Sequence, residues 1–235
     1  MSAYADDLAY IHHHGFSGFA EEAAPGILEM LWRGGIHEGL VVDAGCGSGV
    51  WGRELSRAGL EVFGFDRSAA MLAIARELAP DIRFEQASVD DVVLPSCVAV
   101  TAIGEVLSYG STLESLRDFF VRADAALRDR GMLIFDLAER EGAAAHLDRT
   151  RIEGEDWVVI TVKSLQDDLL TRHVTTYRQL GDDVRKSEET HTLRLYDRFE
   201  VAALLRELGF LVKVRRSYGT RRLPPGHAVF IATKG

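Results

Sequence analysis

Three glycines at alternate positions, Gly45, Gly47 and Gly49, follow a short apolar run at residues 40–42. Glycine lets the backbone come close to a ligand, and the first turn of a following helix offers backbone N–H groups that have no partner. Turns of this kind bind nucleotides in several folds. The spacing therefore predicts a nucleotide site between a strand and a helix, and it leaves the kind of nucleotide open.

Two carboxylates near this turn narrow the choice of ligand. Asp43 precedes the glycines, where it would repel a pyrophosphate but attract a cationic amino group. Asp66 ends the next apolar stretch about 20 residues later, where a carboxylate can accept hydrogen bonds from both ribose hydroxyls. The dinucleotide fingerprint G-x-G-x-x-G is incomplete, because Val50 occupies its sixth place. The pattern favours a ligand with a ribose and an ammonium group, and it disfavours a NAD-dependent oxidoreductase.

The sequence D-x-G-C-G-x-G, followed by an acid that closes the second strand, resembles class I S-adenosylmethionine-dependent methyltransferases of the small-molecule type. The resemblance runs over residues 38–137 and implies S-adenosylmethionine as cofactor, with S-adenosylhomocysteine as product. It implies that the three glycines pass under the methionine part, that Asp43 lies near its amino group and that Asp66 binds the ribose. Around the adenine and the sulfonium it places Arg67, Met71, Ser88, Val89, Ile103 and Gly104.

An N-terminal segment at residues 4–19 precedes the glycine turn and contains three consecutive histidines, at positions 12–14. In the methyltransferases that the chain resembles, such a segment folds over the cofactor as a lid, and an early tyrosine contacts the cofactor carboxylate. We expect Tyr10 in that role. Consecutive helical residues point in different directions, so the three histidines cannot converge on one metal ion and no metal site is predicted. His14 is a candidate acid, base or acceptor contact.

Methyl transfer from a sulfonium is an in-line displacement that depends mostly on orientation and on the exclusion of water. An amine that arrives neutral needs no strong base, whereas an alcohol or phenol needs a histidine or carboxylate within hydrogen-bond reach. His191 and Glu189 share one face of an expected strand and form a candidate base and its partner. Tyr109 is expected to face the acceptor. These residues leave open whether nitrogen, oxygen or carbon is methylated.

The elements that must position these residues follow from the apolar pattern. Short apolar runs alternate with helical periodicity, which is typical of a parallel sheet covered on both faces. A capping box at Ser111 and Glu114 is expected to begin one of the helices. The apolar runs cover residues 40–42, 61–65, 82–87, 97–103 and 132–135. We expect an α/β fold with a Rossmann-like, mostly parallel, seven-stranded sheet and helices on both faces.

From about residue 151 the pattern changes to an alternation of polar and apolar positions with turn residues between the runs. It predicts a late antiparallel insertion of three strands, at residues 156–163, 172–180 and 188–195. We expect a single methyltransferase domain over residues 1–235. Its parts are an N-terminal helical lid (1–37), a cofactor-binding core (38–150), an antiparallel flap over the acceptor site (151–196) and a last helix with the final strands (197–235).

The composition limits the class of protein. Hydrophobic residues make up 47% of the 235, and only two cysteines occur, so a core without disulfides in a reducing compartment is expected. A net charge of −9 argues against nucleic acid or a membrane surface as partner. Residues 1–15 contain no lysine or arginine, unlike a signal peptide, and no apolar run is long enough to cross a membrane. We expect a cytoplasmic monomer or homodimer that acts on a small-molecule acceptor.

Two alternative functions stay open at this point. A methyltransferase that acts on a protein or RNA would use the same cofactor site, although the net charge disfavours RNA and a flap would restrict a bulky partner. A non-catalytic protein would bind the cofactor without turnover on any acceptor.

Overall fold

A computed structural model describes residues 4–109, 112–142, 147 and 149–235. Its centre is a seven-stranded sheet in the order β10-β13-β5-β4-β1-β2-β3, in which β13 runs antiparallel to both of its neighbours and the other pairs are parallel. The strands are β1 (Leu40–Ala44), β2 (Glu61–Asp66), β3 (Arg83–Gln86), β4 (Cys97–Ala102), β5 (Leu127–Ala138), β10 (Phe210–Arg215) and β13 (His227–Lys234). The expected Rossmann-like fold is confirmed.

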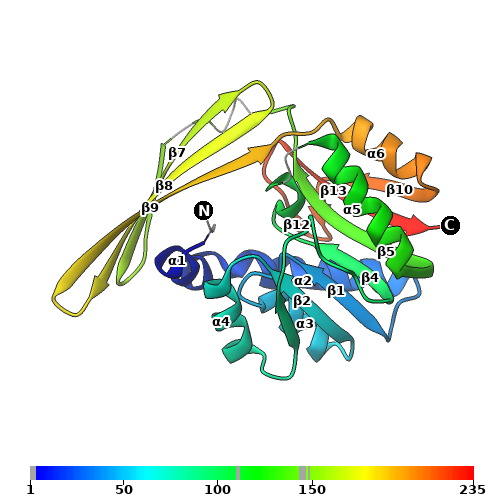
Figure 1. Ribbon diagram of the computed structural model, residues 1–235, viewed down its shortest axis with the longest axis horizontal. Helices are drawn as coiled ribbons and strands as arrows, with labels where there is room; N and C mark the ends of the chain where they lie inside the picture. Colours follow the sequence, from blue (N-terminus) through cyan, green and yellow to red (C-terminus); the bar gives the residue numbers. More distant parts are fainter. Residues whose placement is uncertain (1–3, 110–111, 143–146, 148) are drawn as a thin grey trace.

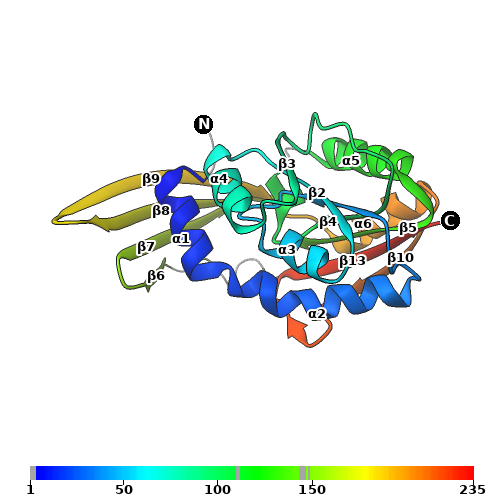
Figure 2. The ribbon, with the colours of Figure 1, turned by 90° about the horizontal axis from the view of Figure 1, so that it is seen from below.

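Helices cover both faces of this sheet because each carries an apolar stripe. One face packs against α5 and α6, whose buried residues share a core with Val100 and Phe135 of the sheet. The other face packs against α2 and α3, and Figure 2 shows α2 and α5 on opposite sides. The helices are α1 (Asp6–Phe16), α2 (Gly18–Arg33), α3 (Val50–Arg57), α4 (Ala69–Leu78), α5 (Leu113–Ala126) and α6 (Arg198–Glu207), with a 3-10 turn η1 (Val106–Tyr109).

The start of α5 differs from the expectation. Thr112 is the N-cap residue, and its side chain and that of Ser115 exchange hydrogen bonds with each other's backbone N–H. The expected cap at Ser111 lies outside the described residues, and Glu114 falls in the first helical turn instead of closing a capping box. Both serine and threonine can cap a helix, so the spacing of polar residues alone does not select between adjacent candidates.

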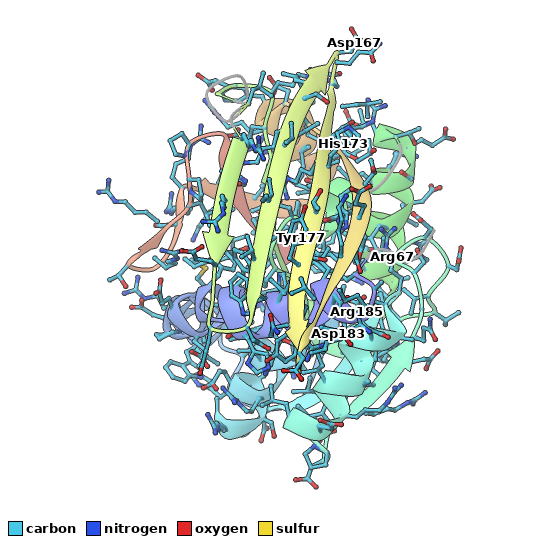
Figure 3. The ribbon with its side chains drawn as sticks, turned by 90° about the vertical axis from the view of Figure 1, so that its left-hand side faces the viewer. Arg67, Asp167, His173, Tyr177, Asp183 and Arg185 are labelled. Atoms are coloured by element: carbon cyan, nitrogen blue, oxygen red, sulfur yellow. The ribbon has the colours of Figure 1, made fainter. Side chains whose placement is uncertain are left out.

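The late antiparallel insertion is confirmed as a separate sheet, with four strands instead of three. They are β6 (Arg149–Glu153), β7 (Trp157–Gln166), β8 (Leu169–Leu180) and β9 (Asp183–Arg194), each antiparallel to the next. We call this sheet the flap. Figure 3 shows it face-on, with Asp167 at the turn between β7 and β8 and Asp183 at the start of β9. The turn between β8 and β9 projects away from the central sheet (Figure 1). The residues of both strands near this turn are mostly polar, so the alternation of polar and apolar residues does not mark where the strands end.

The first helix lies beneath the flap and is held to it (Figure 1). Leu8 and Ile11 pack against Trp157, Val159 and Val174 of the flap. The side chain of Asp7 is almost fully buried, and it accepts hydrogen bonds from Arg185 Nε at 2.6 Å and from the Ser187 hydroxyl at 3.0 Å. These contacts bring the N-terminal segment over the carboxyl ends of the central strands. In the part of the chain that the structure describes, no helix is long and apolar enough to cross a membrane.

Candidate active site

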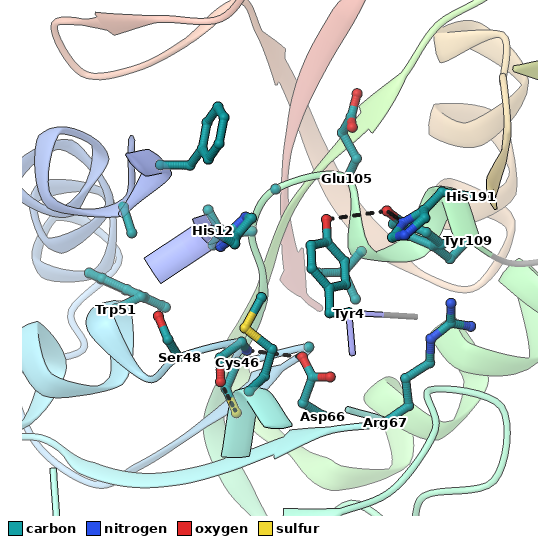
Figure 4. A pocket seen from close by; sticks show the side chains of 18 of the residues that line it. Tyr4, His12, Cys46, Ser48, Trp51, Asp66, Arg67, Glu105, Tyr109 and His191 are labelled. Atoms are coloured by element: carbon teal, nitrogen blue, oxygen red, sulfur yellow. Dashed lines mark hydrogen bonds between the residues drawn. The ribbon is translucent and has the colours of Figure 1, made fainter. Parts of the chain in front are cut away.

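A cavity of about 470 Å³ lies where the N-terminal segment, the flap and the carboxyl ends of the central strands meet (Figure 4). In open α/β sheets, ligands bind at this end of the strands. The glycine turn, the loops after β2, β3 and β4, and strands β7 to β9 of the flap all contribute lining residues. Residues far apart in the sequence therefore surround one space.

The glycine turn between β1 and α3 forms one wall. Gly45 and Gly47 line the cavity with φ angles of +64° and +52°, which side chains other than glycine rarely adopt. A Cβ on Gly45 would come within 2.5 Å of Val106, whereas a Cβ on Gly47 would meet no atom within 4 Å. Gly49 does not line the cavity: it precedes α3, and a Cβ on it would lie 3.0 Å from Ala75, so its contact with a cofactor stays a prediction.

Asp66, the last residue of β2, lies beside the glycine turn. Its Oδ2 accepts a hydrogen bond from the Gly47 backbone N–H at 3.0 Å, and its Oδ1 accepts one from the Ser68 N–H at 2.8 Å. Burial raises the pKa of Asp66, although both hydrogen bonds work in the opposite direction. The carboxylate thus lines the cavity while it holds the turn in place.

Asp43 lies below the glycine turn with 2% of its surface exposed. The Thr101 hydroxyl lies 3.3 Å from its Oδ1, while its Oδ2 is buried without a hydrogen-bond partner. Burial raises the pKa of Asp43 to about 8, and the nearby charge of Asp66 adds to the effect. A buried acid with an unpartnered oxygen at a cavity wall is suited to a cationic or N–H-bearing ligand.

The loops after β2, β3 and β4 complete the walls. Four residues expected near the adenine, namely Arg67, Met71, Ser88 and Val89, all line the cavity. So do Ile103 and Gly104, which follow β4. Asp136 of β5 fixes this loop, because its carboxylate accepts the backbone N–H of Gly104 at 2.7 Å and that of Glu105 at 2.9 Å.

The N-terminal segment faces the cavity with other residues than those expected. Tyr4, Leu8, His12 and Phe16, spaced by four residues, line the cavity. Tyr10 and His14 lie on another side of the helix, outside the cavity. The Tyr10 hydroxyl donates to Asp156 at 3.0 Å and the Tyr10 ring lies 3.5 Å from the Arg178 guanidinium, while His14 is exposed beside Tyr10. The structure therefore does not bring Tyr10 and His14 to the cavity, and their expected roles at the cofactor and the acceptor stay predictions.

His12 lines the cavity, although the sequence pattern did not single it out from its two neighbouring histidines. Its Nδ1 is buried and has no hydrogen-bond partner. Burial lowers the pKa of His12 to about 4, with smaller contributions from the neighbouring His13 and His191, so the His12 imidazole is neutral at pH 7. The four-residue spacing from Leu8 to Phe16 is the signal that marks it.

His191 and Tyr109 lie together on the flap side of the cavity (Figure 4). His191 Nδ1 is 3.0 Å from the Tyr109 hydroxyl, and its Nε2 is 3.0 Å from Oε2 of Glu189. The Tyr4 hydroxyl is 3.4 Å from that of Tyr109. Burial raises the pKa of Tyr109 well above its usual value. The expected pairing of His191 with Glu189 is therefore present in the structure.

A second charged cluster was not expected. Glu105 follows β4 and meets Arg172 of the flap at 2.8 Å and the His227 imidazole of β13. Burial alone would raise the pKa of Glu105, but Arg172 and His227 outweigh it and lower the pKa to about 2. Among the described residues, no group of three or more histidines, cysteines or acids is arranged to hold a metal ion.

Comparisons with known proteins agree with this geometry. A family model described as a methyltransferase domain matches residues 41–131. A search of curated proteins finds no match. The chain resembles, among solved structures, a S-adenosylmethionine-dependent methyltransferase from Clostridium acetobutylicum at 14% identity and a TM-score of 0.84, covering 97% of this chain and 98% of that one.

Two further structures share the whole fold. CalS10, described as an amino pentose methyltransferase from Micromonospora echinaspora, is 19% identical with a TM-score of 0.77, covering 99% of this chain and 98% of that one. KedS8, described as a sugar N-methyltransferase from a Streptoalloteichus species, is 20% identical with a TM-score of 0.79, covering 100% and 96%.

The matched domain contains the glycine turn and its two acids, Asp43 and Asp66. Residues 41–131 therefore match a methyltransferase domain, and the whole chain has the fold of these solved methyltransferases.

Proposed function

We propose that the protein methylates a nitrogen or oxygen atom of a small molecule held between the flap and the loop after β4. The observation that carries the proposal is that one cavity is lined both by the glycine turn with Asp66 and by His191 with Tyr109. S-adenosylmethionine supplies a methyl carbon bound to a positive sulfur, and transfer breaks the carbon–sulfur bond and leaves S-adenosylhomocysteine.

The cavity residues fit this cofactor. The Asp43 carboxylate, whose Oδ2 is buried without a partner, would attract the amino group of the methionine part. Gly45 and Gly47 line the cavity without side chains: a Cβ on Gly45 would clash with Val106, and a Cβ on Gly47 would stand in open space. Asp66 would bind the two ribose hydroxyls. Among the other lining residues, Arg67, Met71, Ser88 and Val89 would hold the adenine, and Ile103 and Gly104 would border the sulfonium.

His191 and Tyr109 take up the proton that the acceptor loses. Glu189 accepts a hydrogen from Nε2 of His191, which leaves Nδ1 free to accept the Tyr109 hydroxyl hydrogen. As the acceptor oxygen or nitrogen bonds to the methyl carbon, its proton passes to the Tyr109 oxygen and the Tyr109 proton passes to Nδ1. Tyr109 is thus unchanged at the end, and His191 holds the proton until it returns to water.

The described activities of CalS10 and KedS8 support amino sugars as the first acceptors to test. Their identities of 19% and 20% leave the acceptor of this chain a matter for experiment. The flap supports a small acceptor because it covers the cavity with Val159, Thr161, Arg172, Val174 and His191.

The experiment offers a panel of amino sugars and hydroxylated small molecules together with methyl-labelled S-adenosylmethionine. We expect label in a small product, with a rate at least tenfold lower for His191→Gln and unchanged for the exposed His173→Gln. Label that enters only the protein or RNA of a cell extract would favour a macromolecular acceptor. Cofactor binding without label on any acceptor would favour a binding protein.

A further inference from the structure

The carboxylate of Glu189 joins two segments that lie far apart in the sequence. Its Oε2 accepts the backbone N–H of Tyr4 at 2.7 Å, and its Oε1 accepts that of Ala5 at 2.9 Å. The same Oε2 is 3.0 Å from Nε2 of His191. Burial works to raise the pKa of Glu189, but the hydrogen bonds from His191, Ala5 and Tyr4 outweigh it and lower the pKa. All these donors therefore favour the ionised carboxylate.

The N-terminal segment has a second anchor on the opposite side of the cavity. The Ser68 hydroxyl donates to the Tyr4 carbonyl oxygen at 2.7 Å, and the Ser68 N–H bonds to Asp66. Tyr4 has a φ of +58°, a conformation that a tyrosine adopts only when its surroundings hold it there. Residues 4 and 5 therefore bridge the flap and the loop after β2, and the Tyr4 side chain lines the cavity.

We propose that Glu189 couples the seating of Tyr4 and Ala5 to the orientation of His191. When Tyr4 and Ala5 lie in this position, their N–H groups hold the Glu189 carboxylate in place. Its Oε2 then also accepts the hydrogen on Nε2 of His191. Nδ1 of His191 therefore carries no hydrogen and faces the Tyr109 hydroxyl. With these residues displaced, the carboxylate loses two of its donors, and the imidazole no longer has a fixed tautomer. His191 therefore has the tautomer of a base only when the N-terminal segment covers the cavity. This inference rests on the proposed function, which makes His191 the base and Glu189 its positioning residue.

A single backbone change tests the coupling at a distance from His191. Ala5 has a φ of −66°, which suits proline, and Ala5→Pro removes the one N–H that bonds to Oε1. The control Ala5→Gly keeps that N–H. The readouts are the imidazole ¹⁵N spectrum of His191, assigned through its loss in His191→Gln, and the hydrogen exchange of the Tyr4 amide. Both are measured on the full-length, ligand-free protein.

We expect the wild type and Ala5→Gly to hold His191 as the Nε2–H tautomer. Ala5→Pro should show both tautomers and exchange the Tyr4 amide at least tenfold faster. Glu189→Gln should produce the same two changes without altering the backbone of the segment. The matched control Glu188→Gln should produce neither, because Glu188 is exposed on the other face of β9, where it pairs with Lys186.

An unchanged His191 spectrum in Ala5→Pro, with faster exchange of Tyr4, would overturn the coupling and leave Glu189 as an anchor only. Unchanged exchange in both Ala5→Pro and Glu189→Gln would overturn it as well. Failure of the proposed function is a separate result. If His191→Gln methylates acceptors at the full rate, His191 is not the base, while the tautomer measurement still reports on the coupling.

Discussion

The backbone N–H of Gly47 donates a 3.0 Å hydrogen bond to Oδ2 of Asp66, so the acid that ends β2 holds the turn that follows β1. The second oxygen of Asp66 holds the start of the loop before α4 through Ser68. Two loops that face the ligand thus depend on one carboxylate. This arrangement sets the geometry of the cofactor wall before a ligand arrives, which lowers the cost of ordering it on binding.

Replacing Asp66 with alanine should weaken S-adenosylhomocysteine binding by about 2–4 kcal/mol, or roughly 30-fold or more. The variant loses the hydrogen bonds to the ribose and the support of the Gly47 turn together. Isothermal titration calorimetry measures the change. Asp91→Ala removes an exposed acid from the loop after β3 and should bind normally. Equal affinities for Asp66→Ala and the wild type would exclude Asp66 from the cofactor site.

Gly47→Ala and Gly59→Ala form a matched pair. Both glycines have positive φ, +52° and +88°, and in neither case would a Cβ meet an atom within 4 Å. Each substitution should therefore cost about 1–2 kcal/mol of stability from backbone strain. Only Gly47 lines the cavity, so only Gly47→Ala should also lose affinity for S-adenosylhomocysteine, at least tenfold. Similar losses of affinity in both variants would indicate a general effect of destabilisation instead.

The raised pKa of Asp43 gives a pH dependence with a definite sign. Above pH 4 the unfolded chain releases the Asp43 proton, whereas the folded protein retains it until about pH 8. Stability should therefore fall as the pH rises through this window, by up to about 2.7 kcal/mol between pH 5.5 and 7.5. Urea unfolding of the wild type and Asp43→Asn measures the difference, since the variant lacks this contribution. The same slope for both proteins would contradict the placement of a neutral Asp43 in the core.

We expect opposite results for His12, which lines the cavity, and for Tyr10 and His14, which lie on another side of the N-terminal helix. His12→Leu should lower kcat/KM about tenfold, because the neutral His12 imidazole has an unpartnered Nδ1 at the cavity. His14→Leu and Tyr10→Phe should change neither kcat/KM nor S-adenosylhomocysteine affinity by more than about twofold, because both residues lie outside the cavity. Steady-state kinetics and calorimetry give both values. A strong effect of Tyr10→Phe on cofactor affinity would restore the role first expected for that residue.

The central sheet could be predicted from the sequence because its strands carry their own signals. The apolar runs at residues 40–42 and 97–103 match β1 and β4 closely, and the buried faces of a parallel sheet require such runs. The flap was predicted with one strand too few. The segment 149–153 is mostly polar and pairs only with β7, so its strand depends on a partner that the local sequence does not reveal.

Most of the residues expected at the cofactor line the cavity, and their places along the chain explain why. Gly45, Gly47 and Asp66 lie in neighbouring turns, where spacing along the chain fixes their positions. The choice between His12 and His14 depends on which stripe of α1 meets the core, and both stripes have helical spacing. Glu105 and Arg172 are 67 positions apart and meet only after the flap folds over the core. No local sequence pattern indicates a contact between residues so far apart in the chain.

Thermal unfolding with and without S-adenosylhomocysteine tests most directly whether this cavity holds the cofactor through Asp66 and the glycine turn. For a dissociation constant near 10 μM, about 1 mM ligand stabilises the protein by about 2.7 kcal/mol, which for a chain of this length raises Tm by roughly 5–10 °C. We expect that shift for the wild type, less than about 2 °C for Asp66→Ala, and none with NAD. No shift for the wild type, or the same shift for Asp66→Ala, would contradict the account.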